Sequence, residues 1–326
     1  MRASGFNRRR FGAALAAAAF AAPRVVRSQI IELGGVATRL PYQAPLPRNA
    51  APIYEPPADL KTVLDIYKRM TSAVRVGGAG PYPFVVDTGA NQSVVSTELA
   101  AQLELPMGDS QPLNGVAGVQ VTPTVKTSLQ LGARAVRDAT LCVLPAEAIG
   151  GPGMLGLDQL NGARLTLNFE RQTLSIDSGP SLPGDGDAYN MRAQRRDGQL
   201  TLVDANLAGI KVTAFLDSGA HNTIGNMALR ELAATRYPTT PWSSVPIISV
   251  TGQTIAAQFA DLPSLRIGGI TLPSWPIAFA DLHIFQLWNL IDRPAILIGV
   301  DVLSRFETVC LDFRRDEVRF RLPVKA

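Results

Sequence analysis

Two short motifs in this 326-residue chain each place a carboxylate beside a hydroxyl residue and a glycine. Phe84–Val95 reads FVVDTGANQSVV and Phe215–Ile224 reads FLDSGAHNTI, so both carry Asp-[Thr/Ser]-Gly-Ala after an apolar run. The apolar run predicts a buried strand, and the glycine permits a tight turn directly after it. Each motif therefore predicts a carboxylate at the end of a strand, and two such groups brought together could act as a paired acid and base.

The two halves of the sequence remain similar downstream of these boxes. Each half continues, in the same order, with a glycine-containing segment, a Leu-polar-apolar-Gly segment, an apolar-apolar-Gly turn and a Leu-polar-Phe segment. The first half has Val116–Gly118, Leu129–Gly132, Met154–Asp158 and Leu167–Phe169, and the second has Val250–Gly252, Leu265–Gly268, Leu297–Asp301 and Leu311–Phe313. Internal repetition of this kind predicts two similar lobes that face each other across a pseudo-twofold axis.

With these repeated segments the sequence resembles the retropepsin-like (retroviral-type) aspartic proteases, in a fused two-lobe form similar to exported bacterial members. The resemblance covers roughly Thr71 to Leu322. It implies an all-β fold of two similar β-barrel lobes, related by a pseudo-twofold axis, with the active-site cleft between them. Ala90 and Ala220 favour the retroviral type, since the pepsin type usually carries Ser or Thr at this place.

The resemblance implies an aspartic endopeptidase that hydrolyses an extended polypeptide through a water molecule activated by Asp87 and Asp217. Two carboxylates about 3 Å apart cannot both ionise cheaply, and the aspartic-protease dyad is the type case of this effect. The pair shares one proton, and it then supplies a base for water and an acid for the carbonyl and the leaving nitrogen. No cofactor is expected, and no metal, because His221 and His283 are too few and too scattered for a metal cluster.

The other box residues are expected to support this pair. Thr88 and Ser218 would hydrogen-bond across the interface between the lobes and keep the two loops symmetric. Gly89 and Gly219 would let the backbone approach the carboxylates, and their carbonyls could meet substrate amides.

The alanine that ends each box also affects the chemistry. A hydroxyl at this position could donate to the carboxylate and lower its pKa, which Ala90 and Ala220 cannot do. The sequence therefore predicts a pair that is less acidic than in pepsin-type enzymes, with activity at mildly acidic to near-neutral pH.

Substrate contacts are expected from the polar residues after each box and from two flap-like hairpins. Viral enzymes often carry an Asp at the positions of Asn91 and His221, paired with an Arg at the positions of Leu157 and Val300. Both partners are replaced here, so no buried charge is left unpaired, but substrate preference should differ. The flap candidates are Asn114–Val121 and Ser249–Ile255. The expected substrate-binding residues are Asn91, Gln92, His221, Asn222, Gly118 and Gly252.

The N-terminal segment resembles an export signal. Arg8-Arg9-Arg10-Phe11 is similar to the twin-arginine pattern, and the Ala-rich Gly12–Ala22 that follows is too short to span a bilayer. This predicts export, to the bacterial periplasm, with membrane association only if the segment stays uncleaved. The net charge of +4 comes from this segment, which carries four arginines and no acid, so nucleic acid is not an expected partner.

The expected organisation is a signal at 1–21, a Pro-rich arm at 22–70, a first lobe at 71–177, a linker at 178–190 and a second lobe at 191–326. The expected partner is a protein or peptide substrate, and a monomer should suffice for activity. Cys142 and Cys310 are expected to be buried thiols, with a disulfide between them as the alternative.

Two other functions remain open. One is a peptide-binding module of the same fold without catalysis, against which the intact aspartate in both boxes argues. The other is an actin-like ATPase or sugar kinase, since those proteins use two Asp-x-Gly turns after apolar strands to hold phosphate. The short strands and turns downstream of each box argue against the long helices of that fold.

Overall fold

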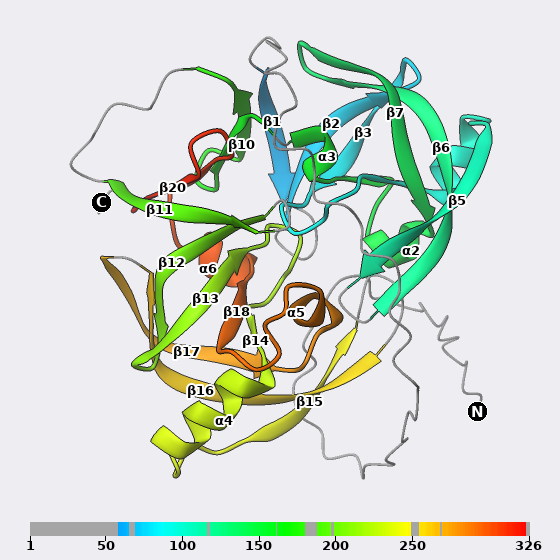
Figure 1. The fold of residues 1–326 in the computed structure, drawn as a ribbon. Coiled ribbons are helices and arrows are strands. Elements are labelled where there is room, and N and C mark those ends of the chain that lie inside the picture. The colour runs from blue at the N-terminus through cyan, green and yellow to red at the C-terminus, as the bar shows by residue number, and fades with distance from the viewer. Residues whose placement is uncertain are drawn as a thin grey trace, which may run out of the picture.

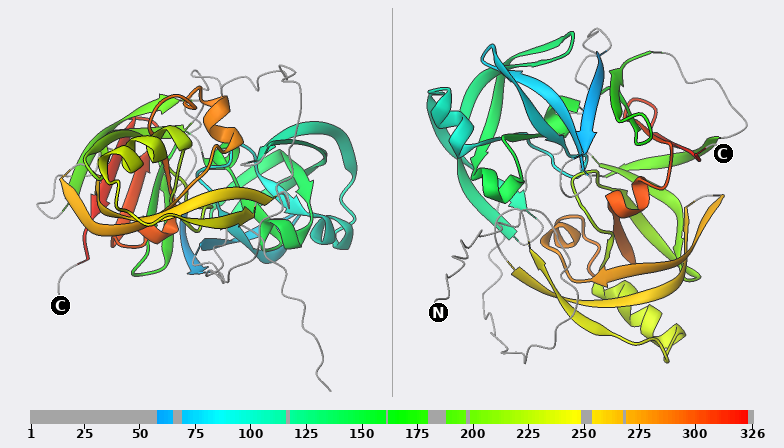
Figure 2. Two further views of the ribbon diagram at one scale, coloured as in Figure 1. Left: turned by 90° about the horizontal axis from the view of Figure 1, so that it is seen from below. Right: turned by 180° about the vertical axis from the view of Figure 1, so that it is seen from behind.

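The computed structural model describes residues 58–64, 69–115, 118–160, 162–179, 188–196, 199–248, 254–267 and 269–323. The expected export signal, most of the Pro-rich arm and residues 180–187 of the expected linker lie outside these ranges. Strands predominate in the described part, and the helices are short. Two lobes lie side by side, the N-terminal one blue to green and the C-terminal one green to orange (Figure 1; Figure 2, left). The prediction of an all-β, two-lobe fold is confirmed.

The first lobe is a curled sheet built around the strand that leads into the first box. Its strands are β2 (Met70–Val76), β3 (Ala79–Val86), β4 (Val94–Ser96), β5 (Met107–Gly115), β6 (Gly118–Leu131), β7 (Arg134–Leu144) and β8 (Gly153–Leu155). Its helices are α1 (Thr97–Gln102), α2 (Ala146–Ile149) and α3 (Leu157–Leu160). Strand β3 pairs antiparallel with β2 and parallel with β8, while β6 pairs antiparallel with β2, β5 and β7. Helix α1 begins where the Ser96 side chain accepts a hydrogen bond from the Leu99 amide.

The second lobe repeats this plan. Its strands are β12 (Gln199–Leu207), β13 (Ile210–Leu216), β14 (Ile224–Gly225), β15 (Ser243–Ile248), β16 (Thr254–Ile267), β17 (Ile270–Phe279) and β18 (Ala295–Ile298). Its helices are α4 (Met227–Arg236), α5 (His283–Leu287) and α6 (Val300–Leu303). Strand β13 pairs antiparallel with β12 and parallel with β18, as β3 does with β2 and β8. The repeat in the sequence is therefore a repeat of strand topology.

A third sheet joins the two lobes. It contains β1 (Ala58–Leu64), β9 (Arg164–Asn168), β10 (Thr173–Asp177), β11 (Ala188–Arg196), β19 (Thr308–Asp312) and β20 (Glu317–Arg321). Its antiparallel order is β1–β10–β9–β19–β20–β11, so β9 of the first half pairs directly with β19 of the second. Strands β1 and β11 also pair with β2 and β12, and thereby continue this sheet into the lobes. Strand pairing thus begins within the segment expected to be the arm.

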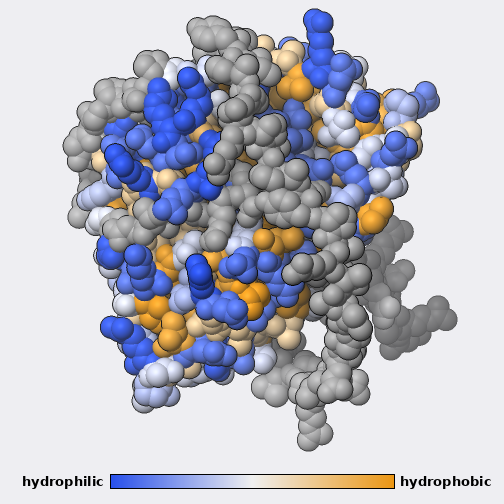
Figure 3. All heavy atoms as spheres, in the orientation of Figure 1, coloured by the Kyte–Doolittle hydropathy of each residue, from blue (hydrophilic) through white to orange (hydrophobic). Residues whose placement is uncertain are grey.

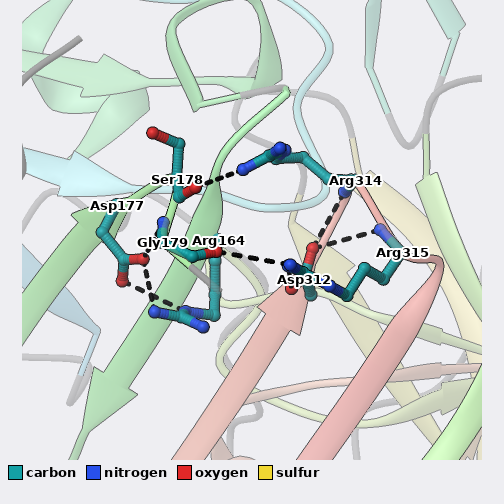
Figure 4. Close-up of polar contacts among 7 residues, drawn as sticks. All are labelled: Arg164, Asp177, Ser178, Gly179, Asp312, Arg314 and Arg315. Carbon is teal, nitrogen blue, oxygen red and sulfur yellow. Dashed lines mark hydrogen bonds and ion pairs between the residues drawn. The ribbon is translucent and has the colours of Figure 1, made fainter. Parts of the chain in front are cut away.

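Ion pairs reinforce this interlobe sheet at one end (Figure 4). The Arg164 guanidinium on β9 pairs with the Asp177 carboxylate on β10, with an Nε to Oδ2 distance of 3.1 Å. On the other half, Arg315 Nη1 lies 2.8 Å from Asp312 Oδ2. Arg315 Nη2 also donates to the Gly179 carbonyl at 3.4 Å, which ties the turn after β19 to the segment after β10.

The core is continuous between the lobes. One hydrophobic cluster includes Val86 and Leu155 of the first lobe, Leu216 and Ile298 of the second, and Val309 of the interlobe sheet. A smaller cluster lies within each lobe beside its box. On the face seen in Figure 3, hydrophilic and apolar side chains are intermixed, and the apolar ones lie in small groups. In the described ranges no helix is both long and apolar enough to cross a bilayer.

Candidate active site

Each box aspartate continues the strand that precedes it. The Asp87 amide, directly after β3, donates to the Leu155 carbonyl of β8 at 2.9 Å. The Asp217 amide, directly after β13, donates to the Ile298 carbonyl of β18 at the same distance. The last three residues of each strand are buried, so the position of each aspartate is set by the core of its lobe.

The turn after each aspartate is folded back onto the carboxylate. Asp87 Oδ1 accepts hydrogen bonds from the amides of Gly89, at 2.8 Å, and Ala90, at 2.9 Å. The two corresponding amides of the second loop donate to Asp217 Oδ1 at 2.8 and 3.0 Å. These bonds fix the orientation of each carboxyl group and favour its ionised form.

The two carboxyl groups meet at the interface between the lobes. A Cβ atom added to Gly89 would lie 2.4–2.6 Å from the carboxyl atoms of Asp217. A Cβ added to Gly219 would lie 2.2–2.5 Å from those of Asp87. Each carboxyl group thus packs against the glycine of the opposite loop, which explains why the residue after the hydroxyl must lack a side chain.

The hydroxyl residues of the boxes lock the loops together. The Thr88 Oγ1 donates to the Leu216 carbonyl at 2.9 Å and accepts from the Ser218 amide at 3.0 Å. The Ser218 Oγ donates to the Val86 carbonyl at 2.7 Å and accepts from the Thr88 amide at 3.1 Å. Both side chains are buried, so these four bonds across the lobe interface hold the aspartates in register.

Burial and mutual repulsion dominate the electrostatics of the pair. Burial raises the pKa of Asp87, while the Asp217 side chain, the backbone amides and the charge of Arg69 oppose that rise. Burial and the neighbouring charge of Asp87 raise the pKa of Asp217 well above its usual range. One carboxyl group therefore holds a proton under conditions where the other is ionised.

In each lobe a hydrogen-bonded hydroxyl–carboxylate pair joins the box loop to the helix that follows the later glycine turn. The sequence analysis did not predict this pair. The Ser93 Oγ donates to Asp158 Oδ1 at 2.6 Å and accepts from the Gly156 amide at 2.9 Å. In the second lobe the Thr223 Oγ1 makes the same two bonds, to Asp301 Oδ1 at 2.7 Å and from the Gly299 amide at 3.0 Å. The repeated sequence does contain the pattern for this pair. Each half has a hydroxyl residue six positions after its box aspartate and an Asp two positions after its later glycine.

The apolar-apolar-Gly turns pack directly against the box loops. The Leu157 amide donates to the Ala90 carbonyl at 2.8 Å, and the Val300 amide donates to the Ala220 carbonyl at 2.8 Å. A Cβ on Gly156 would come within 2.7–2.9 Å of backbone atoms in the first box loop. Leu157 and Val300 themselves are buried, so apolar packing occupies the places where viral enzymes often carry an arginine.

The four polar residues after the boxes are partly exposed beside the aspartates. Asn91 is also held from the second lobe, because Gln199 Nε2 donates to its Oδ1 at 3.2 Å and to the Gly89 carbonyl at 2.9 Å. The Gln92 Oε1 accepts a hydrogen bond from the Cys142 thiol, with Sγ at 3.6 Å. Gln199 was not predicted, because it lies far upstream of the second box in the sequence.

Both flap candidates are flanked by paired antiparallel strands. Strands β5 and β6 pair around the first candidate, and Gly118 is the first residue of β6. Strands β15 and β16 pair around the second, whose Gly252 lies outside the described residues, as do residues 116–117 of the first. Helix α5 of the second lobe contacts β5 of the first, so the first hairpin extends toward the opposite lobe.

The two cysteines are free and buried, so the alternative of a disulfide between them is wrong. Burial raises the pKa of both thiols, which keeps them protonated and poorly nucleophilic. Among the described residues, no group of three or more His, Cys, Asp or Glu side chains is arranged to hold a metal ion.

Two lobes of one topology, each contributing an Asp-[Thr/Ser]-Gly loop to a shared interface, define a two-lobe aspartic protease fold. Comparison with protein families agrees, because the aspartyl protease family matches residues 72–159 and 203–302, more than half of the chain. The chain belongs to this retropepsin-like aspartyl protease family. The match argues against an actin-like ATPase or sugar kinase. Comparison with curated proteins gives no match.

Proposed function

We propose that the protein is an aspartic endopeptidase in which Asp87 and Asp217 form the catalytic dyad. Family membership supports protease activity in general. The observation that carries the finer assignment is the interlocked packing of the two carboxyl groups, each against the glycine of the opposite loop. This packing keeps two carboxyl groups close enough to share one proton, which is the condition for acid–base catalysis by such a pair.

In the proposed reaction, one water molecule binds between the two carboxyl groups. The ionised carboxylate takes a proton from this water, and the water oxygen forms a bond to the scissile carbonyl carbon. The protonated carboxyl group gives its proton to the carbonyl oxygen, so a neutral tetrahedral diol forms. The carboxyl group that took the water proton then gives it to the amide nitrogen, while the other carboxylate takes a proton from a diol hydroxyl. The C–N bond breaks, a carboxylic acid and an amine are released, and each carboxyl group is back in its starting protonation state.

The substrate is an extended polypeptide in this proposal. The two hairpins β5–β6 and β15–β16 would lie along it as flaps and add strand-like backbone hydrogen bonds. The partly exposed Asn91, Gln92, His221 and Asn222 would contact its backbone or side chains. Both lobes come from one chain, so a monomer would be sufficient.

Digestion of a peptide library tests the assignment. Asp87→Asn and Asp217→Asn should each lower the cleavage rate by roughly 10³-fold or more, because either change removes one partner of the acid–base pair. Asp261→Asn is the matched control, since Asp261 is exposed on β16 and should retain full activity. Cleavage at the wild-type rate by either dyad variant would exclude the mechanism.

The same experiment separates catalysis from peptide binding alone. A non-catalytic module would bind library peptides without cleaving them at any pH. An active enzyme should show a bell-shaped rate profile with its maximum at mildly acidic to near-neutral pH, because burial raises the pKa of both aspartates. A maximum near pH 2 would contradict this expectation.

We also propose that the protein is exported to the bacterial periplasm by the twin-arginine route. Arg8-Arg9-Arg10-Phe11 and the Ala-rich segment after it support this, although residues 1–57 lie outside the described ranges. Mass spectrometry of the mature N-terminus should find cleavage near Ala21. Replacing Arg8 and Arg9 by Lys should retain the full-length chain in the cytoplasm, and unchanged export would exclude this route.

A further inference from the structure

A buried glutamine of the second lobe contacts the first box loop. Gln199 is the first residue of β12 and is 2% exposed. Its Nε2 donates to the Gly89 carbonyl at 2.9 Å and to Asn91 Oδ1 at 3.2 Å. The nitrogen of a side-chain amide carries two hydrogens, so both bonds can form at once. The second lobe therefore holds the backbone and one side chain of the first loop together.

The Gly89 carbonyl fixes the orientation of both side-chain amides. A carbonyl oxygen only accepts hydrogen bonds, so the Gln199 atom beside it must be the nitrogen. That nitrogen only donates, so the Asn91 atom that it meets must be the oxygen. A flipped Asn91 amide would place two NH2 groups against each other and leave one Gln199 hydrogen without an acceptor. Asn91 therefore turns Oδ1 toward the second lobe and keeps Nδ2 as the open end of its amide.

The open end of Asn91 is available to a ligand. Asn91 is partly exposed, and it lies four residues after Asp87 in the loop that carries the carboxylate. Among the residues that the structure describes, its Nδ2 has no hydrogen-bond partner. The first loop thus presents a hydrogen-bond donor beside the dyad. An aspartate at this position, as viral enzymes often carry, would present acceptors only when ionised.

The pair formed by Gln199 and Asn91, here called the amide relay, occurs on one side of the dyad. In the second loop His221 takes the place of Asn91. By strand register Arg69 takes the place of Gln199 in the first lobe. Neither His221 nor Arg69 carries a side-chain amide. The two loops therefore offer a bound peptide different hydrogen-bonding groups.

We propose that Gln199 is a positioning residue for substrate selection, because it turns Asn91 so that Nδ2 donates to an oxygen acceptor on a substrate side chain. This inference rests on the proposed protease function and names the substrate class of that site. The peptide position that contacts Asn91 is called the first-loop position. The backbone of an extended peptide would pair with the flap hairpins, which leaves the Asn91 donor for a side chain. The selected peptides carry Asp, Glu, Asn or Gln at this position, and a carboxylate is favoured most because charged acceptors form stronger hydrogen bonds.

An aspartate at position 91 tests the orientation of the amide. Asn91→Asp keeps an oxygen toward Gln199 and replaces the outward NH2 group by a second oxygen, so a donor becomes an acceptor. In a peptide-library digest, the wild type should favour Glu over Ala at the first-loop position by about 10-fold. The Asn91→Asp enzyme should instead favour Lys or Arg there by about the same factor. An unchanged preference would overturn the inference.

Salt separates this local contact from the effect of net charge. At about 0.5 M salt the Debye length is only roughly 4 Å, so a preference that arises from distant charges is screened. The change caused by Asn91→Asp should persist under these conditions. Its disappearance would show that the added charge, and not the outward atom of residue 91, sets the preference, and would overturn the inference.

Removal of the Gln199 amide tests the positioning role. Gln199→Met has nearly the same shape but cannot donate, so the Asn91 amide is free to rotate. The preference for Glu over Ala should then fall by about 5-fold or more. Gln130→Met is the matched control, because Gln130 is exposed on β6 and its Nε2 donates to the Gly132 carbonyl at 3.2 Å. This control should keep the wild-type preference.

A purely structural role of Gln199 predicts a different result. It would lower the rate for all peptides equally and leave the ratio of Glu to Ala peptides unchanged, which would overturn the inference. If the Gln199→Met protein does not fold, Asn91→Asp remains decisive because it leaves Gln199 in place.

Peptide binding separates failure of this inference from failure of the proposed function. The cleavage-deficient Asp217→Asn protein should bind a fluorescent peptide with Glu at the first-loop position about 10-fold more tightly than its Ala counterpart. Asn91→Asp in the same background should reverse that order. Selective binding by a wild-type protein that cleaves nothing would overturn the proposed function alone. Cleavage without any preference that Asn91→Asp changes would overturn this inference alone.

Discussion

The two box loops are close structural copies, while the residues that surround them have diverged. In both lobes two amides hold the carboxylate, a hydroxyl crosses to the other lobe, and a hydroxyl–carboxylate pair supports the loop from below. Corresponding hydrogen bonds differ in length by only about 0.2 Å or less. The parts that orient the aspartates are therefore the parts that remain duplicated.

The surroundings differ in three places. By strand register, with Thr71 paired to Val85 and Thr201 to Phe215, the buried Arg69 corresponds to the buried, neutral Gln199. Val85 corresponds to Phe215, whose ring stacks on Trp288 with centroids 3.7 Å apart. The short helix α2 corresponds to a longer segment of the second lobe that carries α5 and contacts β5.

Under the proposed function, this contrast would give the pseudo-symmetric site a direction along the bound peptide. Symmetric loops alone would let a peptide bind in either of two orientations with equal energy. The first lobe differs by a buried charge and the second by an aromatic stack. These differences remove the equivalence of the two orientations, while the aspartates keep their matching positions. The predictions below test where symmetry holds and where it ends.

The largest expected effect comes from the glycines that touch the opposite carboxyl group. Gly89→Ala and Gly219→Ala each place a methyl group within 2.6 Å of carboxyl atoms, so the aspartate or the loop must move. A misplacement of about 1 Å costs on the order of 10²-fold in rate, and both variants should lose at least that much in kcat/KM. Gly151→Ala is the control, because its nearest contact would be an ordinary 3.7 Å. A fully active Gly219→Ala enzyme would show that the two loops are not equivalent.

The Phe215–Trp288 stack should contribute to the stability of the second lobe, and the first lobe has Val85 in place of Phe215. Trp288 is buried, stacks on Phe215 and packs edge-on against Phe285. Trp288→Ala should lower the free energy of unfolding by about 3–5 kcal/mol, measured by urea denaturation. Trp288→Phe keeps most of the ring area and should recover more than half of that loss. A cost below about 1 kcal/mol for Trp288→Ala would remove the stack as a structural difference between the lobes.

The Thr88 and Ser218 hydroxyls should contribute equally to the free energy of unfolding. Ser218→Ala and Thr88→Val each remove a donor to a carbonyl and leave one buried amide without its acceptor. Each change should lower the free energy of unfolding by about 1–3 kcal/mol. Thr88→Ser keeps the hydroxyl and should retain most of the stability. Losses that differ by more than about twofold would show that the lobe interface is asymmetric at its centre.

The smallest expected effect is the change in stability when Asp158 or Asp301, which hydrogen-bond the box loops, is replaced. Burial raises the pKa of Asp158 and of Asp301, so the stability contributed by their neutral forms is present below pH 3.8 and is lost as pH rises through the folded-state pKa. Asp158→Asn and Asp301→Asn keep an acceptor for the hydroxyl but cannot ionise. Their melting temperatures, relative to wild type, should therefore increase from about pH 4 upward, and by similar amounts. A difference in melting temperature that does not change with pH would contradict burial as the cause of the raised pKa.

The sequence repeat predicted the lobes, the meeting of the two boxes and the contacts of Thr88 and Ser218, because these follow from short motifs that occur twice. Other features depend on which strands pair. Gln199 reaches the first box loop only through the register of β12. Ser93 meets Asp158, and Thr223 meets Asp301, through loops distant in sequence. Strand β1 follows a proline pair and gains its partners from β10 and β2, which no local pattern indicates.

The pairing of β9 with β19 joins two segments that are about 140 residues apart in the sequence. Strands β19 and β20 occupy Thr308–Arg321 and complete both the second lobe and the sheet that joins it to the first. In the interlobe sheet β19 and β20 lie between β9 and β11, so loss of these residues would divide the sheet into two parts. The edge of β9 would then be exposed, and an unpaired strand edge is a site for pairing with another chain.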